Sequence, residues 1–307
     1  MTKNLTPFGN ALANAIQLRH PSFSTKTRDW LQIYQENINT LKSIQSLIRQ
    51  KNTVLVVGAG YESKMSSISK STKNWFKSGV HWTNFHRELK VDLITSTHAC
   101  TLEAAIHHSK NRPSFLIHGV YSKVPPVFMN SATIMWSDPY IDNGMKDLPT
   151  VQDYDDIINK RSKGAIPYLP SVRNTLFLNT MIMIWLGAKN IVFTAVDPHN
   201  PDYFFSDDDE LTLDIVRCLS MCNPWLAEWD GRNERISLLH RNTSHRIQKF
   251  IENLLSQKKS AVGEQSYIEE FDRGFTFLKD FALHRGLNLG YLGDSEYMKT
   301  TGIKKLD

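Results

Sequence analysis

Cysteine is scarce in this sequence, which has three in 307 residues: Cys100, Cys218 and Cys222. Their spacing fits neither a disulfide framework nor the paired cysteines of a zinc site, so we expect a reducing compartment. Apolar runs long enough to span a membrane are also missing. The amino terminus has no long apolar run, and the longest run elsewhere, 175–186, is interrupted by Asn and Thr. The sequence therefore predicts a cytoplasmic protein that neither crosses a membrane nor is exported.

Clusters of basic residues are absent too. The net charge is +5, and charged residues make up 22% of the chain beside 41% hydrophobic residues. A mild positive charge favours anionic ligands and allows a peripheral contact at the inner face of the membrane, whereas nucleic-acid binding needs basic clusters. We therefore expect no nucleic-acid partner. The composition and length predict one α/β domain with a small helical appendage.

The stretch 168–205 has the clearest pattern. The apolar run 175–186 is too long for a strand and ends at Gly187, which is typical of a buried helix. A second run, 190–196, is short and β-branched, as in a central parallel strand. Ligands of open α/β sheets bind beyond the carboxyl ends of the strands. This rule places three side chains at a candidate site: Asp197, His199 and Tyr203.

Four further segments, near positions 54, 92, 115 and 133, also have strand character and end in small or polar residues. Because the carboxyl ends of parallel strands share one edge of a sheet, these ends predict one ligand-binding edge. The predicted fold is a Rossmann-like, mostly parallel sheet flanked by helices. Its candidate ligand contacts at the strand ends are Thr97, His118, Ser137 and Asp138. Helix capping is the alternative role for Thr97.

A glycine loop follows the first predicted strand. Gly58 and Gly60 would let the backbone turn sharply and approach a ligand closely, as a phosphate-binding loop requires. The third glycine of a dinucleotide fingerprint is missing, and Ser63 and Lys64 lie nearby instead. The loop is therefore either a nucleotide-binding loop or a plain tight turn.

The remaining segments define the predicted domain organisation. We expect an N-terminal helical extension over 1–50, a nucleotide-binding domain over 51–205, a helical insertion or lid over 206–266, and a helix and strand completing the sheet over 267–307. The insertion opens with the acidic run 206–210, which is either a D-x-D metal-ligand set or the acidic start of a helix. We favour the helix start, and so predict no metal site.

Several of these segments together resemble a known family. The similarity rests on VLVVGAGYES at 54–63, FLIH at 115–118, SDPY at 137–140, the block from VRNT to TAVD at 172–197, and a closing helix-strand-Ser unit. This combination resembles the bacterial lipooligosaccharide sialyltransferases. It is equally similar to the related 6-hydroxymethylpterin diphosphokinase-like domains of archaeal pterin enzymes and of bacterial surface-glycan and flagellar glycosylation factors. The resemblance covers roughly residues 50 to 300 and implies a sialyltransferase-like GT-A variant of the fold.

The resemblance also implies which residues hold a nucleotide. In the sialyltransferases a G-x-G-P-S loop holds the CMP-sugar, and the proline of that loop is absent here. A strand-end Asn contacts the nucleotide, and a T-S-G segment precedes the long helix. The corresponding residues of this sequence are Gly58, Gly60, Ser63, His118, Asn174 and Thr175.

Catalytic roles follow from the same comparison. Asp197 matches the aspartate that closes the family's central strand, and Tyr203 matches a tyrosine that acts on the departing phosphate. The family's catalytic histidine aligns with Ser266, which leaves His199, His240 and His245 as candidates. We prefer His199 as general base, with packing or capping in its proline-flanked turn as the alternative. Asp197 would then orient the acceptor or the base.

The leading functional expectation is a glycosyltransferase of lipopolysaccharide or other surface-glycan biosynthesis. Its donor would be a CMP-activated acidic sugar, such as sialic acid, a related nonulosonate or Kdo, and its acceptor a glycan or a lipid-linked glycan. Because a CMP-sugar has one phosphate, side-chain and backbone donors can stabilise the leaving group, so no metal or other cofactor is expected.

Two alternatives stay open. The first is a Mg-ATP-dependent 6-hydroxymethylpterin diphosphokinase-like enzyme, whose Mg²⁺ would need carboxylates such as Asp138, Asp197 and the run 207–209. The sequence has no Walker A motif, so ATP would have to use the glycine loop alone. The second is a non-catalytic glycan-biosynthesis protein of the same fold.

Overall fold

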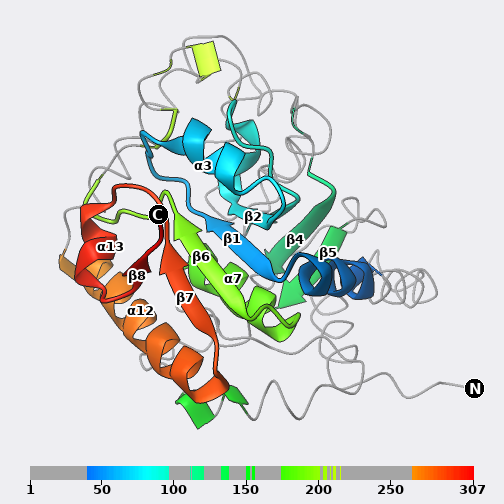
Figure 1. Ribbon diagram of the computed structural model, residues 1–307, viewed down its shortest axis with the longest axis vertical. Coiled ribbons are helices and arrows are strands. Elements are labelled where there is room, and N and C mark those ends of the chain that lie inside the picture. The colour runs from blue at the N-terminus through cyan, green and yellow to red at the C-terminus, as the bar shows by residue number, and fades with distance from the viewer. Residues whose placement is uncertain are drawn as a thin grey trace, which may run out of the picture.

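The described residues form one eight-stranded sheet in the order β5-β4-β3-β2-β1-β6-β7-β8, and every neighbouring pair of strands is parallel. Helices flank this sheet (Figure 1). The predicted fold class is therefore confirmed. The computed structural model describes residues 40–96, 111, 113–120, 133–137, 150–152, 154–155, 174–200, 203–205, 208, 210–211, 215 and 265–307.

The predicted strands near 54, 92, 115, 133 and 191 correspond to β1, β3, β4, β5 and β6. The strands are β1 (Thr53–Val57), β2 (Phe76–Val80), β3 (Leu93–Ser96), β4 (Phe115–Val120), β5 (Thr133–Ser137), β6 (Asn190–Thr194), β7 (Asn288–Tyr291) and β8 (Lys304–Lys305). The helices are a segment over 40–51, α3 (Met65–Ser71), the 3-10 helix η2 (His81–Phe85), α7 (Thr175–Trp185), α12 (Gln265–Arg285) and α13 (Glu296–Thr300).

Strand β2 is an addition to the sequence prediction, which has no strand between β1 and β3. Its sequence FKSGV contains Lys77, Ser78 and Gly79, residue types that strands seldom favour. All of its residues are nevertheless buried. Ser78 Oγ donates to Asn179 Oδ1 at 2.7 Å, and a Cβ on Gly79 would lie 1.9 Å from Thr83 Oγ1. Tertiary packing, not intrinsic propensity, makes this segment a strand.

Apolar layers cover both faces of the sheet. Alternate residues of a strand point to opposite faces, and β1 shows this clearly. Val54 and Val56 pack in a layer with the helix 40–51, α7 and α12, whereas Leu55 and Val57 pack in a layer with α3. In Figure 1, α12 (orange) runs beside β7. No helix in the described ranges has both the length and the apolar character needed to cross a membrane.

Helix α7 and strand β6 have the form predicted for 175–196. The Asn174 side chain caps the helix by accepting a hydrogen bond from Leu176 N at 2.8 Å. Gly187 follows the helix with φ of +99°, a conformation that glycine adopts without steric cost. The chain then enters β6 within three residues. The first turn of α7 therefore lies toward the carboxyl edge of the sheet.

The order of the strands reverses at β1. From β1 the chain proceeds outward through β2, β3 and β4 to β5, and then places β6 on the other side of β1, followed by β7 and β8. The carboxyl ends of β1 and β6 form the topological switch point, where open parallel sheets bind their ligands. The predicted domain boundaries stay predictions, since most of 1–50 and 206–266 lies outside the described residues.

Candidate functional site

Three loops meet at the carboxyl edge of β1, β6 and β7. They are residues 58–64 after β1, residues 195–205 after β6, of which 195–200 and 203–205 are described, and residues 292–295 after β7. Gly60 forms an antiparallel bridge with Tyr203, and Ser295 Oγ donates to Val196 O at 2.7 Å. The structure thus brings the predicted glycine loop and the predicted catalytic segment 197–203 to one edge.

Gly58 and Gly60 allow the backbones of the first two loops to cross closely. A Cβ added to Gly58 would lie 2.3 Å from Ala195 O, and a Cβ added to Gly60 would lie 2.9 Å from the same oxygen. The amide of Gly58 donates to Thr194 O at 2.9 Å, and that of Gly60 to Ala195 O at 3.1 Å. Ala195 itself has φ of +55°, a strained conformation for a residue with a Cβ. Both glycine amides are engaged inside the protein, so other groups would have to bind a phosphate here.

Asp197 organises the turn after β6 through its side chain. Its Oδ1 accepts a hydrogen bond from His199 N at 3.0 Å, and Asn200 N donates to Asp197 O at 3.3 Å. The carboxylate is half-buried, whereas His199 is exposed. Asp197 therefore positions His199 through the backbone of the turn.

Tyr297 of α13 supports the same histidine and was not predicted. Its ring packs edge-to-face with the His199 ring, with centroids 5.6 Å apart. The buried Tyr297 hydroxyl donates to Asp272 Oδ1 at 2.9 Å. Burial, the hydrogen bond to Asp272 and the charge of Asp197 raise the pKa of this hydroxyl far above its usual range. Tyr297 therefore stays protonated and holds one side of the His199 ring.

Tyr203 lies beside the glycine loop. Its ring stacks on Phe205 with centroids 5.1 Å apart and an interplanar angle of 4°. The next residue, Phe204, donates its amide to Ala59 O at 3.4 Å. The segment 203–205 thus folds back over the loop that follows β1.

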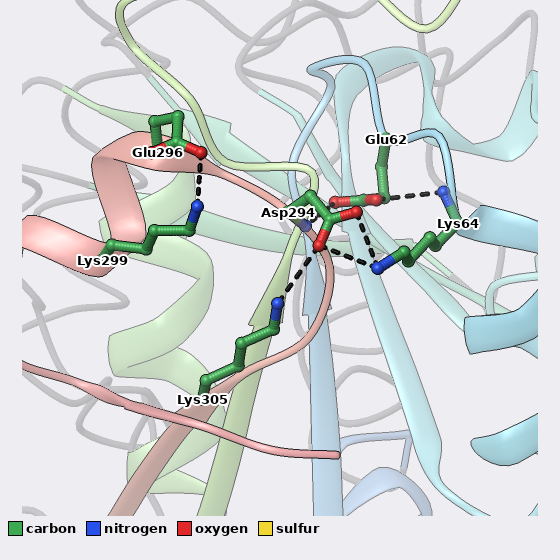
Figure 2. A network of polar contacts seen from close by, with 6 residues as sticks. All are labelled: Glu62, Lys64, Asp294, Glu296, Lys299 and Lys305. Carbon is green, nitrogen blue, oxygen red and sulfur yellow. Dashed lines mark hydrogen bonds and ion pairs between the residues drawn. The ribbon is translucent and has the colours of Figure 1, made fainter.

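A polar network joins the loops of β1 and β7 (Figure 2). Glu62 is 8% exposed, and its two carboxylate oxygens accept hydrogen bonds from Lys64 N at 3.0 Å and Asp294 N at 3.1 Å. Lys64 Nζ pairs with the Asp294 carboxylate at 2.8 Å, and Lys305 Nζ pairs with it at 3.1 Å. Hydrogen bonds from Lys64 and then Lys305 lower the pKa of the Asp294 carboxyl. The sequence prediction missed this network.

The other predicted ligand contacts have separate positions. Ser63 is exposed on the first loop, and Asn174 and the buried Thr175 begin α7. His118 lies in β4 opposite Ser96 of β3, and Ser137 ends β5 opposite Val120. Ser266 lies in the first turn of α12. Four residues lie outside the described residues: Thr97, Asp138, His240 and His245.

Asp208 is the described aspartate of the acidic run. Its Oδ1 accepts a hydrogen bond from Leu211 N at 2.8 Å, and its Oδ2 pairs with Arg87 at 3.3 Å. The helix-start interpretation therefore fits this residue, while Asp207 and Asp209 lie outside the described residues. Where the structure describes the chain, no three His, Cys, Asp or Glu side chains are grouped so as to hold a metal ion.

Comparisons with known proteins gave no match to this chain among family models, curated proteins or solved structures.

Proposed function

We propose that this chain is a glycosyltransferase that transfers an acidic sugar from a CMP-activated donor bound at the β1–β6 switch point. The observation that supports it is the reversal of strand order at β1, which gathers the loops 58–64, 195–205 and 292–295 at one edge. The acceptor would be a glycan or a lipid-linked glycan, reached by a cytoplasmic protein with a peripheral contact at the inner face of the membrane.

The arrangement of the edge is compatible with this chemistry. An acceptor hydroxyl attacks the anomeric carbon of the donor, the bond from that carbon to the phosphate oxygen breaks, and CMP leaves with the electron pair. His199, which is exposed on the turn after β6, takes the proton of the hydroxyl as general base, the role that histidine side chains have most often. Asp197 and Tyr297 position the imidazole, and Tyr203 donates a hydrogen bond to the departing phosphate.

Ligand binding tests the class of nucleotide. A ligand that binds only the folded protein raises its melting temperature in proportion to the logarithm of its concentration above Kd. We expect CMP and CMP-sugars to raise the melting temperature of the parent protein in the presence of EDTA, and ATP with Mg²⁺ to leave it unchanged. Stabilisation by ATP and Mg²⁺ alone would instead favour the diphosphokinase-like enzyme, and stabilisation by no nucleotide would contradict the proposal.

Turnover of a CMP-sugar in EDTA then tests the assigned residues. His199→Ala should lower the rate about a hundred- to ten-thousandfold, as for a lost general base. Tyr203→Phe should lower it about ten- to a thousandfold, as for one lost donor to the leaving group. His284→Ala is the matched control, because His284 lies at the far end of α12. Parental rates in both site variants would show that the turn is structural.

A further inference from the structure

We propose that Lys64 binds the phosphate of the nucleotide and that Asp294 is the internal anion which the phosphate replaces. This inference rests on the proposed function, because it assumes that a nucleotide binds at the switch point. Lys64 follows β1 and Asp294 follows β7, and β6 lies between these two strands. The ion pair of 2.8 Å between them therefore joins the loops on either side of β6, next to the turn that includes His199.

A phosphate bound at this edge would need a cationic partner, and Lys64 is the lysine on the three loops, whereas Lys305 comes from β8. The loops 58–64, 195–205 and 292–295 contain no other lysine or arginine in their sequence. The amide of Gly58 already donates to Thr194 O and that of Gly60 to Ala195 O, so neither amide is available to bind a phosphate. A phosphomonoester such as CMP has a charge of about −1.5 to −2 at neutral pH. An ammonium at this edge is the complement of that charge.

The ion pair between Lys64 and Asp294 can exchange at little cost. The two side chains are 57% and 43% exposed, and water and salt screen an ion pair that is exposed to this degree. The phosphomonoester of CMP has more charge than a carboxylate and attracts the ammonium more strongly. Lys305 Nζ lies 3.1 Å from the same carboxylate, so Asp294 keeps a cationic partner when Lys64 turns away.

Glu62 makes this exchange a side-chain movement alone. The Glu62 carboxylate is 8% exposed and binds the backbone amides of both Lys64 and Asp294. These two hydrogen bonds do not involve the Lys64 ammonium. The backbones of the two loops therefore stay joined while the Lys64 side chain changes its partner.

Calorimetric titration with CMP and with cytidine, which lacks the phosphate, tests the inference. We expect Lys64→Gln to weaken CMP binding about tenfold or more, as for a lost charged hydrogen bond, and to leave cytidine binding unchanged. Asp294→Asn should tighten CMP binding about two- to fivefold, because the competing carboxylate charge is removed. Lys299→Gln is the matched control: Lys299 is 47% exposed and pairs with Glu296, so this variant should bind CMP like the parent protein.

Other results would contradict the role of Lys64, the exchange with Asp294 or the proposed function itself. If Lys64→Gln binds CMP as tightly as the parent protein, or loses cytidine binding equally, Lys64 is not the phosphate ligand, although the proposed function stands. If Asp294→Asn weakens CMP binding, Asp294 supports the lysine instead of competing for it, and the exchange is wrong. If the parent protein binds neither CMP nor a CMP-sugar, both the inference and the proposed function are wrong.

Discussion

Two polar clusters of this protein differ in burial and in how their partners are shared. The inner cluster consists of Ser78, Thr95 and Asn179, and the edge cluster of Glu62, Lys64, Asp294 and Lys305. In the inner cluster all three side chains are 0% exposed, and both hydroxyls donate to Asn179 Oδ1, at 2.7 and 2.9 Å. In the edge cluster two exposed lysines share one exposed carboxylate. A buried network fixes a structure because its unmade bonds are costly, whereas exposed ion pairs can exchange partners.

Removing the centre of the inner cluster should have the largest effect on stability. Asn179→Ala leaves the Ser78 and Thr95 hydroxyls without their acceptor and creates a cavity beneath α7. We expect the free energy of unfolding to fall by about 2–4 kcal/mol, measured by urea denaturation. Asn288→Ala, in which an exposed Asn loses its hydrogen bond to Asn190, should cost less than about 1 kcal/mol. Equal losses in the two variants would contradict the contrast between buried and exposed networks.

The glycine crossing at the edge should be nearly as sensitive. In Gly58→Ala the new Cβ would lie 2.3 Å from Ala195 O, and because that oxygen belongs to the backbone the loops must move apart. Crowding of this kind costs about 1–3 kcal/mol, which urea denaturation would measure. Ser63→Ala, on the exposed part of the same loop, is the control and should leave stability unchanged. Parental stability of Gly58→Ala would mean that the crossing is looser than described.

Within the edge cluster, the buried and exposed members should also differ. Glu62→Gln replaces one acceptor oxygen with an NH₂ group facing a backbone amide, so we expect unfolding to be easier by about 1–2 kcal/mol. Lys64→Gln removes an exposed ion pair and should change stability less than Glu62→Gln does. Thermal or urea denaturation of both variants compares them directly. A greater loss for Lys64→Gln would show that the lysine, not Glu62, joins the loops.

The sequence predicts those parts of the site that depend on residues close together in the chain. The length of the run 175–186 and the stop at Gly187 indicate α7, and the end of the next apolar run places Asp197 at a strand end. Strand β2 escapes the prediction because burial between β1 and β3, not residue type, makes it a strand.

The edge cluster escapes prediction for a different reason. Glu62 and Asp294 are 232 positions apart, and only the strand order brings their loops together. The two local signals are a glutamate two residues after Gly60 and the polar sequence Gly293-Asp294-Ser295 after β7. Neither signal identifies its partner. The buried Tyr297 hydroxyl, which pairs with Asp272 of α12, is hidden from sequence reasoning in the same way.

The smallest expected effect on stability concerns His86, whose burial is intermediate between that of the inner cluster and that of the exposed lysines of the edge cluster. It is half-buried and packs on Phe204 with ring centroids 4.9 Å apart. Burial lowers its pKa below the ordinary value of 6.5, so the unfolded chain takes up the proton at a higher pH than the folded protein. Stability from this residue is therefore complete above pH 6.5 and is lost as the pH falls below it.

Urea denaturation at about pH 7.5 and about pH 5.5 checks this prediction, because the ordinary pKa of histidine lies between these two pH values. His86→Phe keeps a ring against Phe204 and should lose less stability than the parent protein on acidification. An unchanged pH dependence in His86→Phe would show that other groups account for the acid sensitivity.

Hydrogen–deuterium exchange with and without CMP tests the central claim most directly, that the nucleotide binds at the β1–β6 switch point. We predict that saturating CMP slows amide exchange in peptides covering 58–64, 195–205 and 292–295, and leaves exchange in α12 near residues 278–285 unchanged. Slower exchange confined to other parts of the chain, or no slowing anywhere, would contradict the account.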